Sequence, residues 1–205
     1  MSICKRVLAR CDKVLFNQDT KFVDLALQKE GLINELNHKI IDYITRIHLN
    51  NGLPEGESEK ASGWFQAVSD IERIGDHAEN VVKLAEFIIN NRMEFSGAAT
   101  KELQEMMEVA DQTVEKALVA LEEQNTEMAR AVLELESKLD ELEVVFRKNH
   151  IMRLNQNLCA SGAGTIYLDL LTNLERIGDH VRILLNSFCT NNIKRIYNGL
   201  SRPDL

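Results

Sequence analysis

A six-residue segment occurs twice in this chain and constrains its fold more than any other feature. Glu-Arg-Ile-Gly-Asp-His occupies residues 72–77 and again residues 175–180, 103 positions later. The flanking residues agree in character, since Trp64 matches Tyr167 and Val81 matches Leu184. Internal similarity at a fixed distance predicts a fold built from two copies of one structural unit.

The segment that precedes each copy of the motif is also repeated, at a distance of 106 positions. Ile33 matches Leu139, and Glu30 matches Glu136. The three-residue difference between the two distances falls in the connecting loop, where changes in length cost little free energy. Each unit therefore contains a long helix followed by a motif helix, with a further helix before both.

The composition predicts helices and not strands. The 205 residues include only 10 Gly and 2 Pro, and 5% are aromatic, so turn-forming and strand-forming residues are scarce. We expect N-caps at Ser58 and Ser96, a shorter first helix in the first unit, and helical character in the tail around residues 192–197. The expected helices cover residues 3–17, 20–50, 59–92, 98–123, 126–158 and 164–188.

The predicted fold class is all-α, with two tandem three-helix-bundle repeats. The first repeat covers residues 1–95, the second covers residues 96–190, and residues 191–205 form a C-terminal tail. Exposed amphipathic helices and the short first helix favour a homo-oligomer, most simply a dimer.

Charge and cysteine usage exclude several classes of function. With 24 Lys and Arg against 32 Asp and Glu, the net charge of −8 argues against a nucleic-acid partner. The four cysteines lack the paired spacing of a thiolate zinc site, so we expect reduced thiols in a cytoplasmic protein. No segment reaches the roughly 20 apolar residues of a membrane-spanning helix, and no secretory leader is evident. The cysteines are Cys4, Cys11, Cys159 and Cys189.

Each motif carries two carboxylates one helical turn apart. The apolar residues around the motif recur at three- and four-residue spacing and mark a bundle seam, from which Glu72 and Asp76 point away, as do Glu175 and Asp179. Like charges at this spacing destabilise a helix by about 0.2–0.5 kcal/mol. A divalent or trivalent cation would relieve that repulsion, because two carboxylates one turn apart can chelate or bridge a metal.

The preceding long helices offer similar pairs on the flank of their own seams, Glu30 with Asn34 and Glu136 with Asp140. If each motif helix lies beside the long helix of its repeat, the pairs face each other in two outward-facing patches. The first patch would contain Glu30, Asn34, Glu72 and Asp76, and the second Glu136, Asp140, Glu175 and Asp179. Such carboxylates are also common on a solvated helix face, where Arg73 and Arg176 would pair with them.

Other residues of the motif suggest packing roles. Gly75 and Gly178 lie in the middle of a helix, where glycine costs about 1 kcal/mol relative to alanine, so we expect close helix approach beside the carboxylates. His77 and His180 do not share a face with the glutamate of their motif. We therefore expect both histidines to be structural or solvent-exposed and not to be metal ligands.

The doubled ERIGDH motif, each copy downstream of an acidic long helix, resembles the PhoU family over nearly the whole chain. The second repeat is similar in more detail to the PhoU-like C-terminal domain of bacterial sodium/phosphate cotransporters, in residues 147–154 (RKNHIMRL), Cys159 and residues 167–176 (YLDLLTNLER). The resemblance implies a regulatory role in phosphate transport, contact with a phosphate transporter or its membrane domain, and a cytoplasmic location at the inner membrane through that transporter.

The resemblance also implies metal clusters on the acidic pairs. Seven of the eight positions match the family, whereas Asn34 stands where Asp is usual. The first patch therefore has one charge fewer, and we expect it to bind metal more weakly than the second. Oxygen ligands suit Fe, Mn, Mg and Ca alike, while a thiolate zinc site is not expected.

Two alternatives remain open. One is a helical adaptor without metal, whose acidic face binds a basic partner surface. The other is a di-metal carboxylate enzyme of the ferritin-like class, although that class uses inward-facing Glu-x-x-His pairs, whereas here the second carboxylate comes at i+4. No nucleophile–base arrangement is evident, and residues 162–164 lack the lysine of a phosphate-binding loop, so we expect no catalysis.

Overall fold

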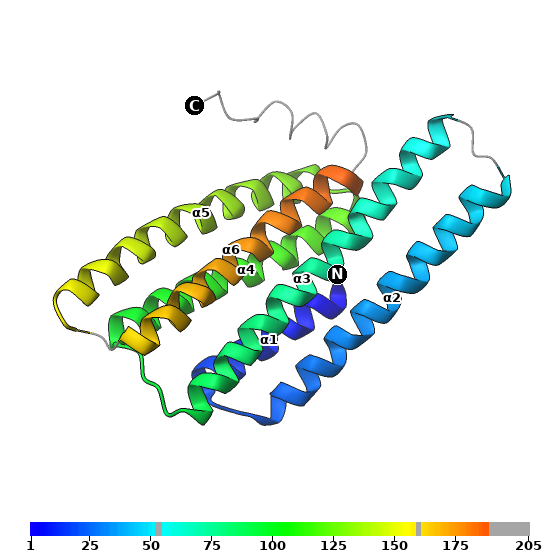
Figure 1. Ribbon diagram of the computed structural model, residues 1–205. Coiled ribbons are helices and arrows are strands. Elements are labelled where there is room, and N and C mark those ends of the chain that lie inside the picture. Colours follow the sequence, from blue (N-terminus) through cyan, green and yellow to red (C-terminus); the bar gives the residue numbers. More distant parts are fainter. Residues whose placement is uncertain (52–54, 159–160, 189–205) are drawn as a thin grey trace.

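The computed structural model describes residues 1–51, 55–158 and 161–188, and in that part of the chain every regular element is an α-helix (Figure 1). The helices are α1 (Ser2–Asn17), α2 (Lys21–Asn51), α3 (Glu55–Asn90), α4 (Gly97–Glu123), α5 (Thr126–Asn155) and α6 (Ser161–Phe188). The predicted all-α fold is confirmed. The helical character expected around residues 192–197 concerns residues outside the described part.

The helix ends follow local capping chemistry. The Ser96 hydroxyl accepts a hydrogen bond from the Ala99 backbone N–H at 3.3 Å, which confirms Ser96 as the N-cap of α4. The prediction for Ser58 is wrong, because α3 already begins at Glu55. α1 and α4 end in the same way, with left-handed residues at Gln18 (φ 54°) and Gln124 (φ 51°), which lie 106 positions apart.

The six helices form two antiparallel three-helix bundles, α1–α3 and α4–α6, that share one hydrophobic core (Figure 1). The two motif helices, α3 and α6, make the most extensive contact between any two helices and join the bundles. The seam expected from the apolar spacing is confirmed, since Ile74, Val81, Ile177 and Leu184 are all buried. The division predicted between residues 95 and 96 falls in the connection between α3 and α4.

A polar ladder crosses the contact between α3 and α6. His180 Nδ1 lies 3.1 Å from Asp70 Oδ1, and His77 Nδ1 lies 3.0 Å from Asn173 Oδ1. The two histidine rings stack with their centroids 5.6 Å apart. Asp70 and Asn173 are themselves 103 positions apart, so the ladder repeats the internal symmetry of the chain. Both histidines therefore contribute to packing between the bundles, as expected for a structural role.

Two thiols attach the first helix to the motif helix of its repeat. Cys4 Sγ lies 3.6 Å from the Ile71 carbonyl oxygen, and Cys11 Sγ lies 3.4 Å from that of Ala78. Both cysteines are free and buried, and burial raises the pKa of the Cys11 thiol to about 12. These two thiols are therefore packing groups in their reduced form.

The first helices of the two repeats differ in length, as predicted. α1 has 16 residues and α4 has 27. The α2–α3 hairpin consequently projects beyond the N-terminus of α1 (Figure 1). Among the described residues, no helix carries an apolar stretch of the length that crossing a membrane requires.

Candidate metal centre

The motif glycines allow each motif helix to lie close to the long helix of its repeat. A Cβ atom on Gly178 would lie 2.6 Å from Leu139 Cδ1, and one on Gly75 would lie 3.0 Å from Ile33 Cδ1. Leu139 and Ile33 are matching positions of the two repeats, so the same close approach occurs twice. The expected role of these glycines is confirmed, and the approach occurs next to the acidic pairs.

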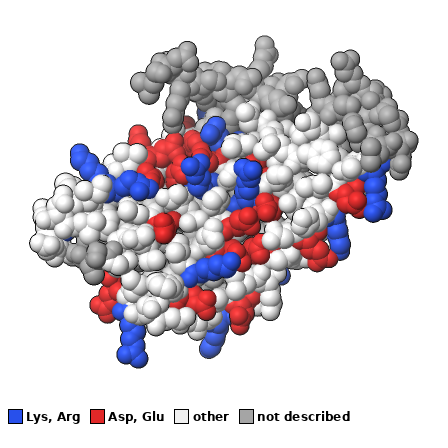
Figure 2. All heavy atoms as spheres, viewed as in Figure 1, with Lys and Arg blue, Asp and Glu red and all other residues white. Residues whose placement is uncertain are grey.

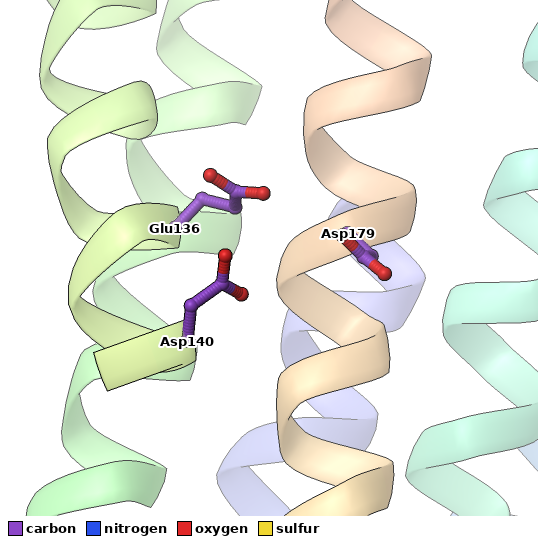
Figure 3. Close-up of side chains that lie close together, drawn as sticks. All are labelled: Glu136, Asp140 and Asp179. Atoms are coloured by element: carbon purple, nitrogen blue, oxygen red, sulfur yellow. The ribbon is translucent and has the colours of Figure 1, made fainter. Parts of the chain in front are cut away.

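In the second repeat, the close approach gathers three carboxylates between α5 and α6. Glu136 and Asp140 extend from α5 toward Asp179 on α6 (Figure 3), and one oxygen atom of each lies within 4.8 Å of the others. Oxygen ligands bind Ca²⁺ and Mg²⁺ at about 2.0–2.6 Å, so two ligands on opposite sides of one ion are about 4–5 Å apart. The spacing of the three oxygen atoms therefore fits a hard cation.

The prediction that all the acidic pairs face outward is wrong for two residues. Glu136 is only 6% exposed, and Glu30 is only 7% exposed. Both lie on the flank of the seam, and that flank is covered because the motif glycine brings the neighbouring helix close. The half-buried members of the eight predicted positions are Asn34, Glu72, Asp76, Asp140, Glu175 and Asp179.

Two arginines on α6 lie within the second cluster. Arg182 Nε donates a hydrogen bond to Glu136 Oε1 at 2.6 Å, and its Nη2 lies 3.5 Å from Asp179 Oδ1. Arg176 Nη1 lies 3.3 Å from Asp179 Oδ2, and its Nε lies 3.6 Å from Glu175 Oε2. The cluster therefore already contains positive charge, and a cation that bound all three carboxylates would compete with Arg182.

Two carboxylates of the second cluster, Glu175 and Glu136, have raised pKa values despite these arginines. Burial, and then repulsion from Asp179, raise the pKa of Glu175 to about 7, although Arg176 lowers it. Burial also raises the pKa of Glu136, against the effect of Arg182. Glu175 lies outside the group of three converging oxygen atoms, but its charge is added to the same site.

The first repeat has a looser arrangement of the same kind. Asn34 Nδ2 donates a hydrogen bond to Glu30, and the Asn34 Oδ1 atom is buried without a hydrogen-bond partner. Burial, Glu79 and Asp76 raise the pKa of Glu30, and burial together with Asp76 raises that of Glu72. Within the described residues, a compact group of three carboxylates occurs in the second repeat alone.

Sequence reasoning missed the residue that distinguishes the two clusters. Arg182 lies 103 positions after Glu79, so a cation in the second repeat matches a carboxylate in the first. Glu79 pairs with Lys83 at 2.5 Å and adds to the charge around Glu30. The repeat alignment contains this charge reversal, and it could have been found there. Figure 2 shows acidic groups over α5, α6 and α3 with basic side chains among them.

Two three-helix bundles, each with acidic pairs on its second and third helices, define a class of all-helical double-repeat proteins. The chain belongs to the PhoU domain family, which matches residues 1–85 and 103–187. These two segments place one copy of the family's domain on each repeat.

Relatives similar in sequence align with most of the chain. A phosphate-specific transport system accessory protein PhoU homolog from Xylella fastidiosa is 28% identical over 170 residues, which is 82% of this chain and 69% of that protein. PhoU homolog 1 from Thermotoga maritima is 24% identical over 158 residues, 77% of this chain and 67% of that protein.

Solved structures share the fold. The crystal structure of PhoU from Pseudomonas aeruginosa has a TM-score of 0.80 at 19% identity, covering 91% of this chain and 90% of that one. The phosphate transport system regulatory protein PhoU from Streptococcus pneumoniae has a TM-score of 0.77 at 19% identity, covering 100% of this chain and 92% of that one.

Proposed function

We propose that this chain is an accessory protein of a phosphate transport system, which regulates a phosphate transporter, or its membrane domain, by direct contact. Membership of the PhoU family over both repeats supports this role, and the relatives from Xylella fastidiosa and Thermotoga maritima are accessory proteins of phosphate-specific transport. The chain would act in the cytoplasm, at the membrane through the transporter, as a dimer and without catalysis of its own.

We further propose that the acidic clusters bind a hard metal cation such as Fe, Mn, Mg or Ca. The observation that carries this proposal is the convergence of Glu136, Asp140 and Asp179, whose oxygen atoms lie within 4.8 Å of one another. The raised pKa values of Glu136 and Glu175 favour a bound cation, because the cation offsets the repulsion between neighbouring carboxylates. Bound metal would supply positive charge that fixes α5 against α6.

Arg182 supports a second candidate, a helical adaptor that works without metal. Its guanidinium lies against both Glu136 and Asp179, so it partly neutralises the cluster by itself. In that case the half-buried carboxylates would contribute to a surface for a basic partner.

Capture on a phosphate transporter tests the regulatory role and separates the two candidates. The chain would be passed over the transporter held in detergent, with and without prior treatment with a chelator. Retention that the chelator abolishes supports the metal-bound regulator. Retention that resists the chelator but is lost in an Asp140→Asn, Asp179→Asn variant supports the adaptor. Absence of retention under both conditions would contradict the regulatory role.

A further inference from the structure

A buried histidine in the second repeat stands where the first repeat has an apolar residue. His150 on α5 is 3% exposed, and its counterpart 106 positions earlier is Ile44, which is 7% exposed. Gly164 on α6 likewise matches Ala61, 103 positions earlier. This position of the fold therefore accepts an aliphatic side chain, and packing alone does not require an ionisable ring there.

Gly164 makes the room that the imidazole ring occupies. A Cβ atom on Gly164 would lie 2.7 Å from His150 Nε2. The ring also packs against Tyr167, with the two ring centroids 4.9 Å apart. The histidine and the glycine are thus matched to each other, since Ile44 and Ala61 replace both of them in the first repeat.

The surroundings of His150 suit the neutral ring and not the charged one. Its Nε2 atom is buried and has no hydrogen-bond partner among the described residues. A neutral imidazole can place its unprotonated nitrogen there, whereas a protonated imidazole carries an N–H group on both nitrogens and needs an acceptor for each. Protonation would therefore bury an N–H group and a positive charge without a partner.

The charged and titratable groups that face His150 in the described part of the chain are Arg153 on its own helix, Glu102 on α4 and Tyr167 on α6. Glu102 already accepts hydrogen bonds from Arg153 at 2.7 Å, from Asn149 at 2.9 Å and from Tyr167 at 2.5 Å. Its oxygen atoms are therefore engaged. Burial, and then the charge of Arg153, lower the pKa of His150, although Glu102 raises it.

These residues hold the beginning of α4 and the connection that precedes it. Glu102 lies in the second turn of α4 and pairs with Arg153 of α5. Phe95, in the connection between α3 and α4, packs edge-on against Tyr167 with the ring centroids 5.9 Å apart. Because this connection joins the two repeats, a change that loosens these contacts also loosens the junction between the repeats.

We propose that His150 is the trigger of an acid-sensitive latch, formed with Arg153, Glu102 and Tyr167. The latch holds the N-terminal end of α4 against α5 and α6 while the imidazole is neutral, and it opens when the imidazole takes up a proton. Opening exposes the imidazolium to water and separates it from Arg153. This inference goes beyond the proposed function and does not depend on bound metal.

The pH range of the response follows from His150. The closed latch disfavours a proton that the open latch accepts at the ordinary pKa of 6.5, so the closed state loses stability as the pH falls below that value. Burial acts to raise the pKa of Glu102, but its hydrogen bonds from Arg153, Tyr167 and Asn149 hold that pKa below the ordinary value of 4.5. Opening between pH 6.5 and pH 5 therefore comes from His150 and not from Glu102.

Hydrogen–deuterium exchange within α4 tests the latch. The measured quantity is the exchange rate of residues 97–106 divided by that of residues 110–120 in the full chain, because both segments share the intrinsic pH dependence of exchange. We expect this ratio to rise by about tenfold between pH 7.5 and pH 5.5, since each pH unit below the ordinary pKa changes the open population by up to tenfold.

Three variants assign the response. His150→Gln should keep the ratio constant, and so should His150→Ile, Gly164→Ala, which reproduces the pair Ile44 and Ala61 of the first repeat. His38→Gln, which changes an exposed histidine on α2, should retain the rise. A ratio that stays constant in the parent chain would overturn the proposal whatever the variants do, and so would a rise of equal size in either folded His150 variant.

Discussion

Gly178 is the residue that allows the acidic cluster to form, because a side chain there would meet Leu139. Gly178→Ala should lower the free energy of unfolding by about 1–2 kcal/mol, since overpacking of a full core outweighs the helix propensity gained. Gly31→Ala is the matched control, since nothing lies within 4 Å of a Cβ atom there and the residue is exposed. It should stabilise by about 0.5–1 kcal/mol in urea denaturation. Equal stabilisation by both changes would contradict the close-approach role.

Glu175 should make stability depend on pH. Its pKa is about 7 in the folded chain, against an ordinary value of 4.5, so the folded state binds more protons than the unfolded state between these values. The free energy of unfolding of chelator-treated protein should therefore fall as pH rises from about 4.5 to 7. Denaturation at pH 5 and 7.5 measures the fall, and Glu175→Gln should reduce it, whereas the exposed Glu122→Gln should not.

Asn34 and Arg182 each make one cluster less negative. Asn34 is neutral where the matching residue is Asp140, and Arg182 adds a positive charge beside Glu136. Asn34→Asp should tighten cation binding in the first repeat, and Arg182→Gln should tighten it in the second, because each change makes the site more negative. Titration calorimetry with Mn²⁺ would measure each dissociation constant, with an expected decrease of about fivefold to tenfold. Unchanged constants in both variants would show that neither cluster binds the ion.

Sequence patterns predicted the positions of the acidic residues better than their burial and their partners. The eight predicted positions followed from the repeat and from the family resemblance, and three of them converge. The burial of Glu136 could not be predicted from the apolar spacing of α5. That spacing gives the direction of a side chain relative to one helix, whereas Glu136 is covered by α6, whose close approach depends on Gly178. The role of Arg182 depends on where a long, flexible side chain finds its partner, which spacing along one helix does not fix.

At the scale of single elements, a half-buried ion pair between Glu102 and Arg153 joins α4 to α5. Glu102→Gln should destabilise the protein by about 3 kcal/mol, because it leaves the Arg153 charge half-buried and without its partner. Glu105→Gln on the same helix is the control, since its pair with Lys138 is exposed and 3.4 Å long, and it should cost less than about 1 kcal/mol. Thermal unfolding of both variants gives the comparison, and equal losses would contradict the account.

The sequence predicted the presence of the helices more reliably than the residues at which they begin. All six helices followed from apolar spacing and the scarcity of Gly and Pro. Ser96 was found because its cap directly precedes a helix, whereas the prediction for Ser58 failed because α3 starts three residues before it, at Glu55. Local chemistry gives candidate caps, and tertiary packing decides which one begins the helix.

At the scale of the whole molecule, the two repeats are joined through their motif helices. Asp76 and Asp179 directly precede the stacked histidines His77 and His180, so each acidic cluster borders the contact between the bundles. The molecule thus carries a proposed cation site on each repeat.

Elemental analysis of the purified protein tests the central claim, that the converging carboxylates hold a metal cation. The test variant is Glu136→Gln, Asp140→Asn, Asp179→Asn, and the control removes three exposed charges as Glu108→Gln, Glu122→Gln, Glu123→Gln. After incubation with iron, manganese or magnesium and removal of the excess, the parent and the control should retain metal, and the test variant should retain markedly less. Folded protein that is metal-free in all three samples would contradict the claim and favour the metal-free adaptor.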